Sequence, residues 1–425
     1  MAIGDLVRNE FFAFCDPDTG ARVERLTSPK VTSHLPKQTC RYTSADGTVM
    51  LYVGECGEYR QLYAMNLLTG VAVQLTSGKG LCEYECVWLD ADDAHALFAQ
   101  GGAIWRVNLE TLLRERLYEC ERGWLPQCFT LSGDGRYVLV TEYEHTSVPV
   151  SLEETDWSYF ALTTIASPHC RIVMLDRKTG ERRVVRDERC WLGRASLRPG
   201  DPDTVLYCHE GPYDYIDDRM WIVNVDGTDV RCVRHTPPGA VVVGETWAAD
   251  GSGVYHLYSD EKSRAGGADG GLASICVTDI ATLETHRAMG CHLYAHCSGS
   301  CDGRWAAGDA SDGVLLHLLS KNGTEHPDDY IYLVDVRHWR EVRLCHHASS
   351  WGAGYGTIQD AHPHPAFSDD CRYLLFTSDR DGHPAVYRVD LTRFLWARGR
   401  AEGPFEADSP ELPDSSWGFL STFGA

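Results

Sequence analysis

The sequence has no long apolar run: no hydrophobic stretch reaches the roughly 18 residues that a membrane-spanning helix needs. Its first residues, MAIGDLVRNEFFAF, lack an apolar core followed by a small-residue cleavage site, so we predict no secretory signal and a cytoplasmic protein. Positive charge is scarce, with 39 Lys and Arg against 61 Asp and Glu and a formal net charge of −22. Such a field repels nucleic acid and anionic membranes, so we expect neither as a partner. An acidic ligand would need a locally positive pocket.

Cysteine is abundant but lacks the spacings of a disulfide framework or a zinc site. There are 17 cysteines, an odd number, without any Cys-x-x-Cys pair. The nearest approaches are Cys82 with Cys86 and Cys297 with Cys301. Disulfide scaffolds are normally much shorter chains. Most of these cysteines lie in apolar runs, such as VLYCHEG and ASICVTD, which predicts buried, reduced thiols.

Long amphipathic helical patterns are almost missing, and SLEETDWSYFALTTIA, residues 151–166, is the best helical candidate. Elsewhere one pattern returns: a turn rich in Asp and Gly, a β-type run, a second β run, another turn and a charged strand. Seven copies begin with SADGTVMLYVG, DADDAHALFAQ, SGDGRYVLVTEYE, PGDPDTVLYCHEG, AADGSGVYHLYSD, SCDGRWAAGD and SDDCRYLLFTS.

These copies predict an all-β fold, a single seven-bladed β-propeller over residues 1–400. Their spacing of about 43 to 68 residues is that of propeller blades with insertions. One blade cannot bury both of its faces, whereas blades stacked radially can. We expect the first and last segments to close the ring, with six or eight blades as alternatives because insertions blur the units. Residues 401–425, with AEGPFEADSPELPDSSWGF, are predicted as an acidic, Pro-rich surface tail.

The segment QDAHPHPAF, residues 359–367, carries His362 and His364 on alternate positions with a proline after each. It falls between the sixth copy's last strand and the seventh copy's first, hence in a connection between blades. Pro363 and Pro365 disfavour helix at the residues before them. We therefore expect an extended segment that presents the two imidazoles in parallel.

Two imidazoles in that arrangement suit a single divalent metal. Gln359 would add an oxygen, and His296, just before the sixth copy's first strand, would add a third imidazole from the equivalent position one blade back. The alternative is that these histidines are solvated loop residues or hydrogen-bonded core groups. Spacing alone does not decide between the two interpretations.

Other polar residues stand at corresponding places in other copies. KVTSHLPKQTCRY carries His34 and Arg41 ahead of the first copy, and YCHEGPYDYIDDRMW carries His209 and Arg219 in the fourth. The second of these stretches interrupts what should be a simple hairpin, which indicates a specialised loop. A solvated or structural role for the arginines is the alternative.

Over nearly its whole length the chain resembles the oligogalacturonate lyases, seven-bladed propeller enzymes of bacterial pectin breakdown. The HPHPAF block and the CHEGP and DRMWIVNVDG blocks carry the resemblance most specifically. It implies a divalent metal, typically manganese, on His296, Gln359, His362 and His364, although Ca²⁺, Zn²⁺ or another dication also suits such a set. It also implies a small acidic oligosaccharide as the substrate and places Arg219 near it.

His34, Arg41 and His209 fall in blocks that resemble the active-site face of that family, so we expect His34 and Arg41 to bind substrate together with Arg219. One position departs from the family. The family has a histidine, proposed as the general base, at the start of the fifth blade; here VVVGETWAADG has Gly244 there, followed by Glu245 and Trp247.

The implied reaction is β-elimination, in which a base removes H5 of a 4-linked uronate and O4 leaves to give a 4,5-unsaturated sugar. A dication and an arginine would stabilise the charge that develops on the carboxylate. Candidate replacement bases are His209, Tyr213 and Tyr215. Galacturonate, with an axial O4, is eliminated anti, whereas glucuronate needs syn elimination, for which one tyrosine can act as base and acid.

We therefore hypothesise a changed substrate, such as a glucuronate-containing oligosaccharide. The alternative is a metal-holding, uronate-binding propeller without lyase activity. A protein-interaction propeller of the WD type is disfavoured, because the repeats lack the GH…WD signature. The sequence carries no signal of oligomeric state.

Overall fold

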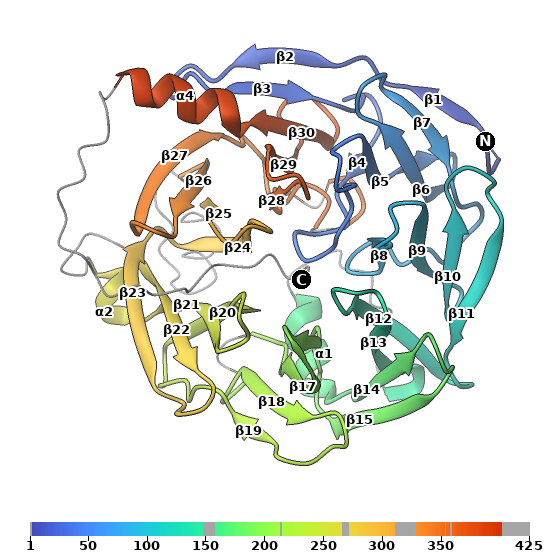
Figure 1. Cartoon of the computed structure of the whole chain (residues 1–425), viewed down its shortest axis with the longest axis vertical. Helices are drawn as coiled ribbons and strands as arrows, with labels where there is room; N and C mark the ends of the chain where they lie inside the picture. The colour runs from blue at the N-terminus through green and yellow to red at the C-terminus, as the bar shows by residue number, and fades with distance from the viewer. Residues whose placement is uncertain are drawn as a thin grey trace.

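The computed structural model describes residues 2–147, 158–212, 215–265, 272–310, 328–352, 354–357 and 359–401. Within these residues the strands form seven antiparallel sheets arranged as a ring around a central axis (Figure 1). The predicted seven-bladed β-propeller is therefore confirmed. Each sheet is one blade, with its first strand next to the axis and its fourth at the rim.

The strands of each blade follow one another outwards. The innermost strands are β4 (Ser33–His34), β8 (Val87–Leu89), β12 (Trp124–Leu131), β16 (Ser196–Arg198), β20 (Val241–Trp247), β24 (Tyr294–Gly299) and β28 (Ala366–Phe367). The second strands are β5 (Val49–Cys56), β9 (His95–Gln100), β13 (Tyr137–Glu144), β17 (Asp201–Cys208), β21 (Gly253–Ser259), β25 (Trp305–Ala310) and β29 (Tyr373–Ser378).

The outer half of each blade is less buried at its rim. The third strands are β6 (Tyr59–Asn66), β10 (Ala103–Asn108), β14 (His169–Asp176), β18 (Met220–Asn224), β22 (Ala273–Asp279), β26 (Tyr330–Asp335) and β30 (Ala385–Asp390). The fourth strands are β7 (Val71–Gln74), β11 (Arg114–Glu119), β15 (Arg182–Arg189), β19 (Arg231–Cys232), β23 (Thr285–Cys291), β27 (Arg340–His346) and, in the last blade, β3 (Arg22–Arg25).

The start of the chain closes the ring, as predicted. Strand β3 pairs antiparallel with β30, placing Val23 opposite Val389, and β2 (Phe12–Cys15) continues that blade outwards. Strand β1 (Leu6–Arg8) instead extends the first blade beside β7. The N-terminal residues therefore join the first and last blades through backbone hydrogen bonds.

The repeat seen in the sequence starts one strand later than the blade does. Each Asp/Gly turn joins the innermost strand to the second, so the pattern of turn and three runs matches strands two to four. The innermost strands are as short as two residues in β4 and β28. A run of two residues carries no measurable period, which explains why the sequence pattern does not show β4 and β28.

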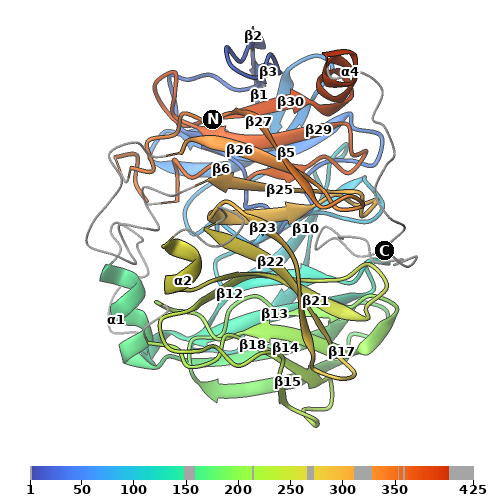
Figure 2. The same ribbon diagram turned by 90° about the vertical axis from the view of Figure 1, so that its left-hand side faces the viewer.

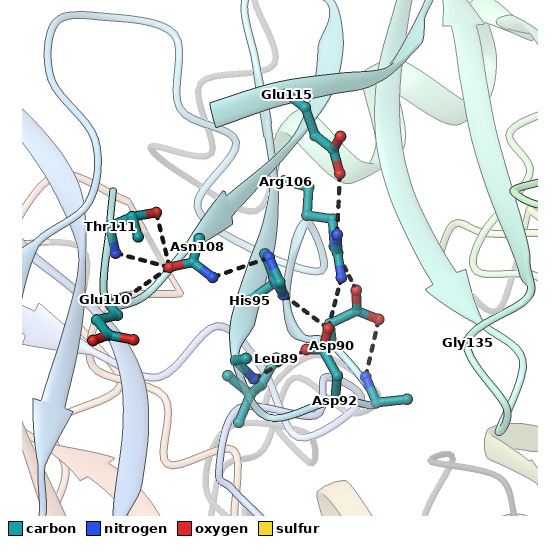
Figure 3. A network of polar contacts seen from close by, with 12 residues as sticks. Leu89, Asp90, Asp92, His95, Arg106, Asn108, Glu110, Thr111, Glu115 and Gly135 are labelled. Carbon is teal, nitrogen blue, oxygen red and sulfur yellow. Dashed lines mark hydrogen bonds and ion pairs between the residues drawn. The ribbon is translucent and has the colours of Figure 1, made fainter. Parts of the chain in front are cut away.

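The aspartates of the Asp-rich turn in the second blade are held by cationic side chains. In the second blade, Arg106 Nε lies 2.8 Å from Asp90 Oδ2 and its Nη2 lies 2.6 Å from Asp92 Oδ2, while His95 Nδ1 lies 2.8 Å from the same Asp92 oxygen (Figure 3). Arg177 of the third blade reaches across to Asp90 at 2.7 Å. This ion pair ties the second and third blades together.

Helices are few among the described residues. The predicted helix is present as α1 (Ser158–Ala166), and its first predicted residues, 151–157, lie outside the described part. The others are η1 (His145–Ser147), α2 (Glu261–Arg264) and α4 (Leu391–Ala401). Seen from the edge of the ring, α1 lies at one of the two faces (Figure 2).

Helix α4 is not predicted by the sequence pattern; it buries Leu391 and Phe394 against the last blade. The predicted acidic tail, apart from Ala401 at the end of this helix, lies outside the described residues. In the ranges given above, no helix combines the length and apolar character needed to cross a bilayer.

Candidate metal centre and the cavity around it

His362 and His364 lie in an irregular segment that leads from the rim strand β27 to the innermost strand β28. The expected connection between blades is present, but its expected extended conformation is not. The φ of His364 is +46°, in the left-handed region, and the two imidazole planes meet at 39° instead of being parallel. A following proline disfavours only the right-handed helical region, and here His364 avoids it by a turn instead of a strand.

His296 comes from the neighbouring blade. It lies inside the innermost strand β24, at a bulge, and not in a connection between blades as expected. Its Nδ1 lies 2.7 Å from Oδ2 of Asp309, the residue opposite it on β25, and its backbone N–H donates to Oδ1 of the same carboxylate at 2.7 Å. This contact fixes the ring and directs Nε2 away from Asp309.

The three imidazoles converge on one point. Ligand nitrogens of His296, His362 and His364 all lie within 4.8 Å of one another. The side-chain oxygen of Gln359 lies 3.0 Å from His364 Nε2. Burial holds the pKa of His362 and His364 well below the usual range, so both rings are neutral, as metal ligands must be.

Hydrogen bonds from outside the ligand set support this geometry. His364 Nδ1 lies 2.8 Å from Gln38 Oε1, and the His364 backbone N–H donates to Asp309 Oδ2 at 3.3 Å. Asp309 is fully buried. Because it contacts both His296 and His364, it links the two blades from which these histidines come. Three neutral nitrogens and an amide oxygen with oriented second partners are a donor set that fits a divalent transition metal.

His34 lies beside this centre but in a different network. Its Nε2 is 3.1 Å from Glu83, and Arg60 binds both Glu83, at 3.0 Å, and Asp360, at 2.6 Å. The Arg60 guanidinium takes the place that a cation would fill among these carboxylates. Because Asp360 follows Gln359 directly, this buried ion-pair network supports the metal centre from behind, and His34 itself does not line the cavity.

Arg41 lies at the other end of the innermost strands. Its guanidinium binds Asp93 at 2.6 Å and Asp369 at 2.8 Å, both in the Asp-rich turns, and donates to the carbonyl of Asp90 at 2.6 Å. The structure therefore brings Arg41 together with the turns of the second and seventh blades and not with the predicted metal ligands.

A cavity of about 750 Å³ opens beside the three histidines. His296, Gln359 and His362 form part of its wall. The indole of Trp351 stacks near His296, with ring centroids 5.9 Å apart and planes at 11°. Phe160 of α1 also lines it, which places the opening on the face that carries α1.

Arg219 lines the cavity but is held on both sides by carboxylates. It reaches Glu210 at 2.9 Å and Glu245 at 3.0 Å. Burial alone would raise the pKa of Glu245, but the facing Arg219 outweighs it and lowers the pKa to about 2. Two carboxylates thus compensate the charge of Arg219 before any substrate enters.

The predicted bases lie at the edge of this cavity or outside it. Cys208 and Glu210 line it, whereas His209, between them on the strand, points to the other side and binds Glu188 at 3.1 Å. Burial lowers the pKa of His209, but contacts with Cys190 and Glu188 outweigh this and raise it to about 9. Tyr215 is 56% exposed and away from the cavity wall, and Tyr213 lies outside the described residues.

Gly244 occupies a bulge of β20 on the cavity wall. Its φ is +69°, in the region that glycine adopts most easily. A Cβ added there would lie 2.5 Å from the sulfur of Cys297, which follows His296 on β24. Cys297 therefore occupies the space that a side chain at residue 244 would need.

Three residues of the site were not predicted from the sequence: Gln38, Asp309 and Lys37. The sequence around Asp309 does indicate a special role, because a single carboxylate stands in the run WAAGDA, which consists mostly of small residues. All six positions of this run are buried. Lys37 lines the cavity with φ +116°, a strained backbone directly before Gln38. No sequence pattern distinguishes Gln38 from a surface glutamine.

Fold and site together define a β-propeller that carries a candidate metal centre inside a ligand-sized cavity. The chain belongs to the oligogalacturonate lyase family: the family model described as oligogalacturonate lyase matches residues 1–394.

Named relatives agree with this assignment. The chain is 31% identical to the oligogalacturonate lyase of Dickeya dadantii (strain 3937), over 93% of this chain and all of that protein. It is also 31% identical to the oligogalacturonide lyase of Pectobacterium atrosepticum over the same shares. Among solved structures, an oligogalacturonate lyase in complex with manganese matches with a TM-score of 0.82 and 32% identity, covering 93% of this chain and all of that one. The oligogalacturonate lyase of Vibrio parahaemolyticus matches with a TM-score of 0.81 and 30% identity, over 92% and 99%.

Proposed function

We propose that this chain is a metal-dependent lyase that cleaves 4-linked uronate oligosaccharides by β-elimination and leaves a 4,5-unsaturated sugar. The observation that carries the proposal is the convergence of His296, His362 and His364, with Gln359, beside a cavity large enough for sugar residues, whose wall includes His296, Gln359 and His362. A divalent ion held by these residues, manganese in our proposal, would polarise the substrate carboxylate and so acidify the neighbouring H5. A related lyase was solved in complex with manganese.

The charges of the cavity support a dependence on metal. Its described wall carries three cationic side chains, Lys37, Arg194 and Arg219. It also carries four carboxylates, from Glu83, Glu85, Glu210 and Glu245. The protein groups alone therefore leave the wall slightly negative, which repels a uronate. A dication on the imidazoles reverses that sign and makes the cavity a binding place for an acidic sugar.

The proton acceptor is proposed from the loop between β17 and β18. This loop borders the cavity through Glu210, Gly211, Pro212 and Arg219, and Tyr213 follows Pro212 in the chain. His209, with its pKa raised to about 9, is a cation at neutral pH and suits this role less well. We therefore propose Tyr213 as the base. Comparing the lyase activity of Tyr213→Phe with that of His209→Gln tests this choice.

A tyrosine base fits syn elimination, so we propose glucuronate-containing oligosaccharides as a substrate class beside oligogalacturonate. The glycine at residue 244 and the sulfur of Cys297 against it support a changed catalytic set at this wall. An activity screen over both kinds of oligomer tests the proposal, with ultraviolet absorbance and mass spectrometry detecting the unsaturated product. Each reaction is run with and without chelator. Faster turnover of oligogalacturonate would contradict the changed substrate, and chelator-resistant turnover would contradict the metal dependence.

A binding propeller without lyase activity is the second candidate, favoured by the absence of any side chain at Gly244. Calorimetric binding of a uronate oligomer without unsaturated product would establish it. For either function we propose a reducing, cytoplasmic location, because all 17 cysteines lie in described residues and none forms a disulfide.

A further inference from the structure

Arg194 stands in the connection that leads from the rim strand β15 to the innermost strand β16, and it lines the cavity. Its backbone is fixed on either side. The Leu192 carbonyl accepts from Gln127 Nε2 at 2.9 Å, and the Ala195 carbonyl accepts from Thr130 Oγ1 at 2.6 Å. Both donors belong to β12 of the neighbouring blade, so the base of the Arg194 side chain is held rigidly at the cavity wall.

The charged side chains of this wall are almost all paired. Lys37 Nζ lies 3.8 Å from Glu85, and Arg219 binds Glu210 and Glu245. The remaining carboxylate of the wall, Glu83, is bound by Arg60 at 3.0 Å. Every acidic group that the described wall presents therefore already has a cationic partner.

Arg194 differs from these cations. Its Nη2 donates only to the backbone carbonyl of Glu245, at 3.3 Å. Its Nη1 is buried and makes no hydrogen bond within the described part of the chain, where Arg194 also has no ion-pair partner. A buried cationic donor without an acceptor is costly, and an anion entering the cavity would supply both the acceptor and the opposite charge.

We infer that Arg194 is the residue that receives a carboxylate of the bound uronate oligomer, a role that rests on the proposed substrate class. A guanidinium binds a carboxylate through two donors in one plane, so Arg194 would select for the acid over a neutral sugar or a methyl ester. Arg219, which the sequence indicates for contact with substrate, would instead shape the wall through its two glutamates.

The test compares binding of an acid and its ester to Arg194→Gln. The probe is monomeric galacturonate, which carries no sugar on O4 that could leave, together with its methyl ester. Binding is measured by calorimetry on the manganese-loaded protein. Loss of charge-assisted hydrogen bonds predicts an affinity for the acid lowered about 10- to 100-fold in the variant, with the affinity for the ester changed less than about 3-fold.

Two further variants make the result specific. Arg116→Gln, on the rim strand β11 with a half-exposed side chain, makes the same change in net charge away from the cavity and should bind like the wild type. Arg194→Lys keeps the charge but not the planar pair of donors, and an intermediate affinity is expected. If Arg194→Gln does not fold, as judged by its unfolding temperature, the binding measurements on Arg194→Lys test the inference instead.

An acid affinity within twofold of the wild type in the Arg194 variants overturns the inference, as does an equal loss for acid and ester. A wild-type protein that binds no uronate overturns it as well. The comparison needs no turnover. Absence of unsaturated product in the activity screen would therefore refute the lyase proposal while leaving the role of Arg194 testable.

Discussion

At the scale of single residues, Asp309 is the residue on which the metal centre depends most without being a ligand. It orients His296 through two hydrogen bonds and accepts another from the backbone of His364. Carboxylates in this position fix the tautomer of a metal-binding imidazole and raise its basicity. Its loss should therefore weaken metal binding while all four ligands stay in the chain.

Asp309→Asn is expected to lower metal affinity about 10- to 100-fold, because the amide accepts less strongly and carries no charge. Competition with a fluorescent chelator measures the affinity. Asp302→Asn serves as the control, since Asp302 lies in the Asp-rich turn of the same blade, where it accepts from Ser300 at 2.6 Å. Equal metal affinity in the two variants would show that Asp309 does not support metal binding.

The pair of Glu245 and Arg219 makes stability depend on pH. In the folded protein the pKa of Glu245 is about 2, below its ordinary value of 4.5. The folded state therefore takes up this proton less readily than the unfolded chain does. The stabilisation is complete above the ordinary pKa and is lost as the pH falls towards the folded value.

Glu245→Gln should lower the free energy of unfolding at neutral pH by about 1–3 kcal/mol, since Arg219 keeps Glu210 as a partner but loses one buried acceptor. Urea titrations at several pH values from about 6 down to 3 test this. The difference between variant and wild type should shrink as the solution becomes more acidic. A difference that stays constant would show that the pKa of Glu245 is the same in the folded and unfolded protein.

The sequence indicated a cluster of polar side chains because Gln359, His362 and His364 stand within six residues of one another, and the structure brings the two histidines together with His296. That these residues bind a metal stays a prediction. The sequence did not indicate Arg194, Gln38 or Asp309. Their roles arise from contacts between blades, such as that of Gln38 with His364, which are separated by 326 positions in the chain. Nor could the sequence show that Glu210 and Glu245 compensate Arg219. Such pairing depends on the stacking of blades, which a local pattern does not encode.

At the scale of elements, the bulge in β20 determines what can stand at residue 244. The register of β20 against β21 shifts between Val243 and Thr246, and Gly244 takes a left-handed conformation there. The sequence repeat did not include this innermost strand, and a bulge leaves no trace in an alternating pattern. The same limit explains the left-handed turn at His364, where the prolines predicted an extended chain.

Gly244→Ala is expected to destabilise the protein by about 1–2 kcal/mol from backbone strain alone. The contact of the new methyl group with Cys297 adds to this. In a Cys297→Ala background the second contribution should vanish, so the glycine substitution should cost less there. A double-mutant cycle measured by urea unfolding gives the coupling. Additive losses would show that β20 moves away from β24 to admit the methyl group.

At the scale of the whole molecule, the predicted ligands of the metal centre come from two blades. His296 belongs to the sixth blade, and Gln359, His362 and His364 belong to the segment entering the seventh. A metal bound there holds these blades together and binds only the folded ring. It should therefore stabilise the entire propeller and not only its own loop.

Removing metal with a chelator should lower the unfolding temperature, and restoring manganese at about 100 times its dissociation constant should return about 2.7 kcal/mol of stability. Differential scanning calorimetry follows both steps. The double variant His362→Ala, His364→Ala should melt at one temperature with or without metal. A metal-dependent shift in that variant would place the binding site elsewhere.

The closing strand gives a second prediction at this scale. Val23 of β3 is fully buried opposite Val389, whereas Leu6 of β1 is 69% exposed. Val23→Ala should lower the global free energy of unfolding by about 1–3 kcal/mol through the cavity it leaves. Leu6→Ala should change it by less than about 0.5 kcal/mol. Similar effects of the two changes in urea titrations would mean that the ring does not depend on β3 for closure.

The joining of β3 to β30 also bears on how the protein is made. A ribosome releases β2 and β3 well before β30, so the two partners emerge more than 350 positions apart. Until then the early strands have unpaired edges that can associate with other nascent chains. We expect assembly of the last blade to follow the release of β30, and chaperone demand in the cell to concentrate on the interval before it.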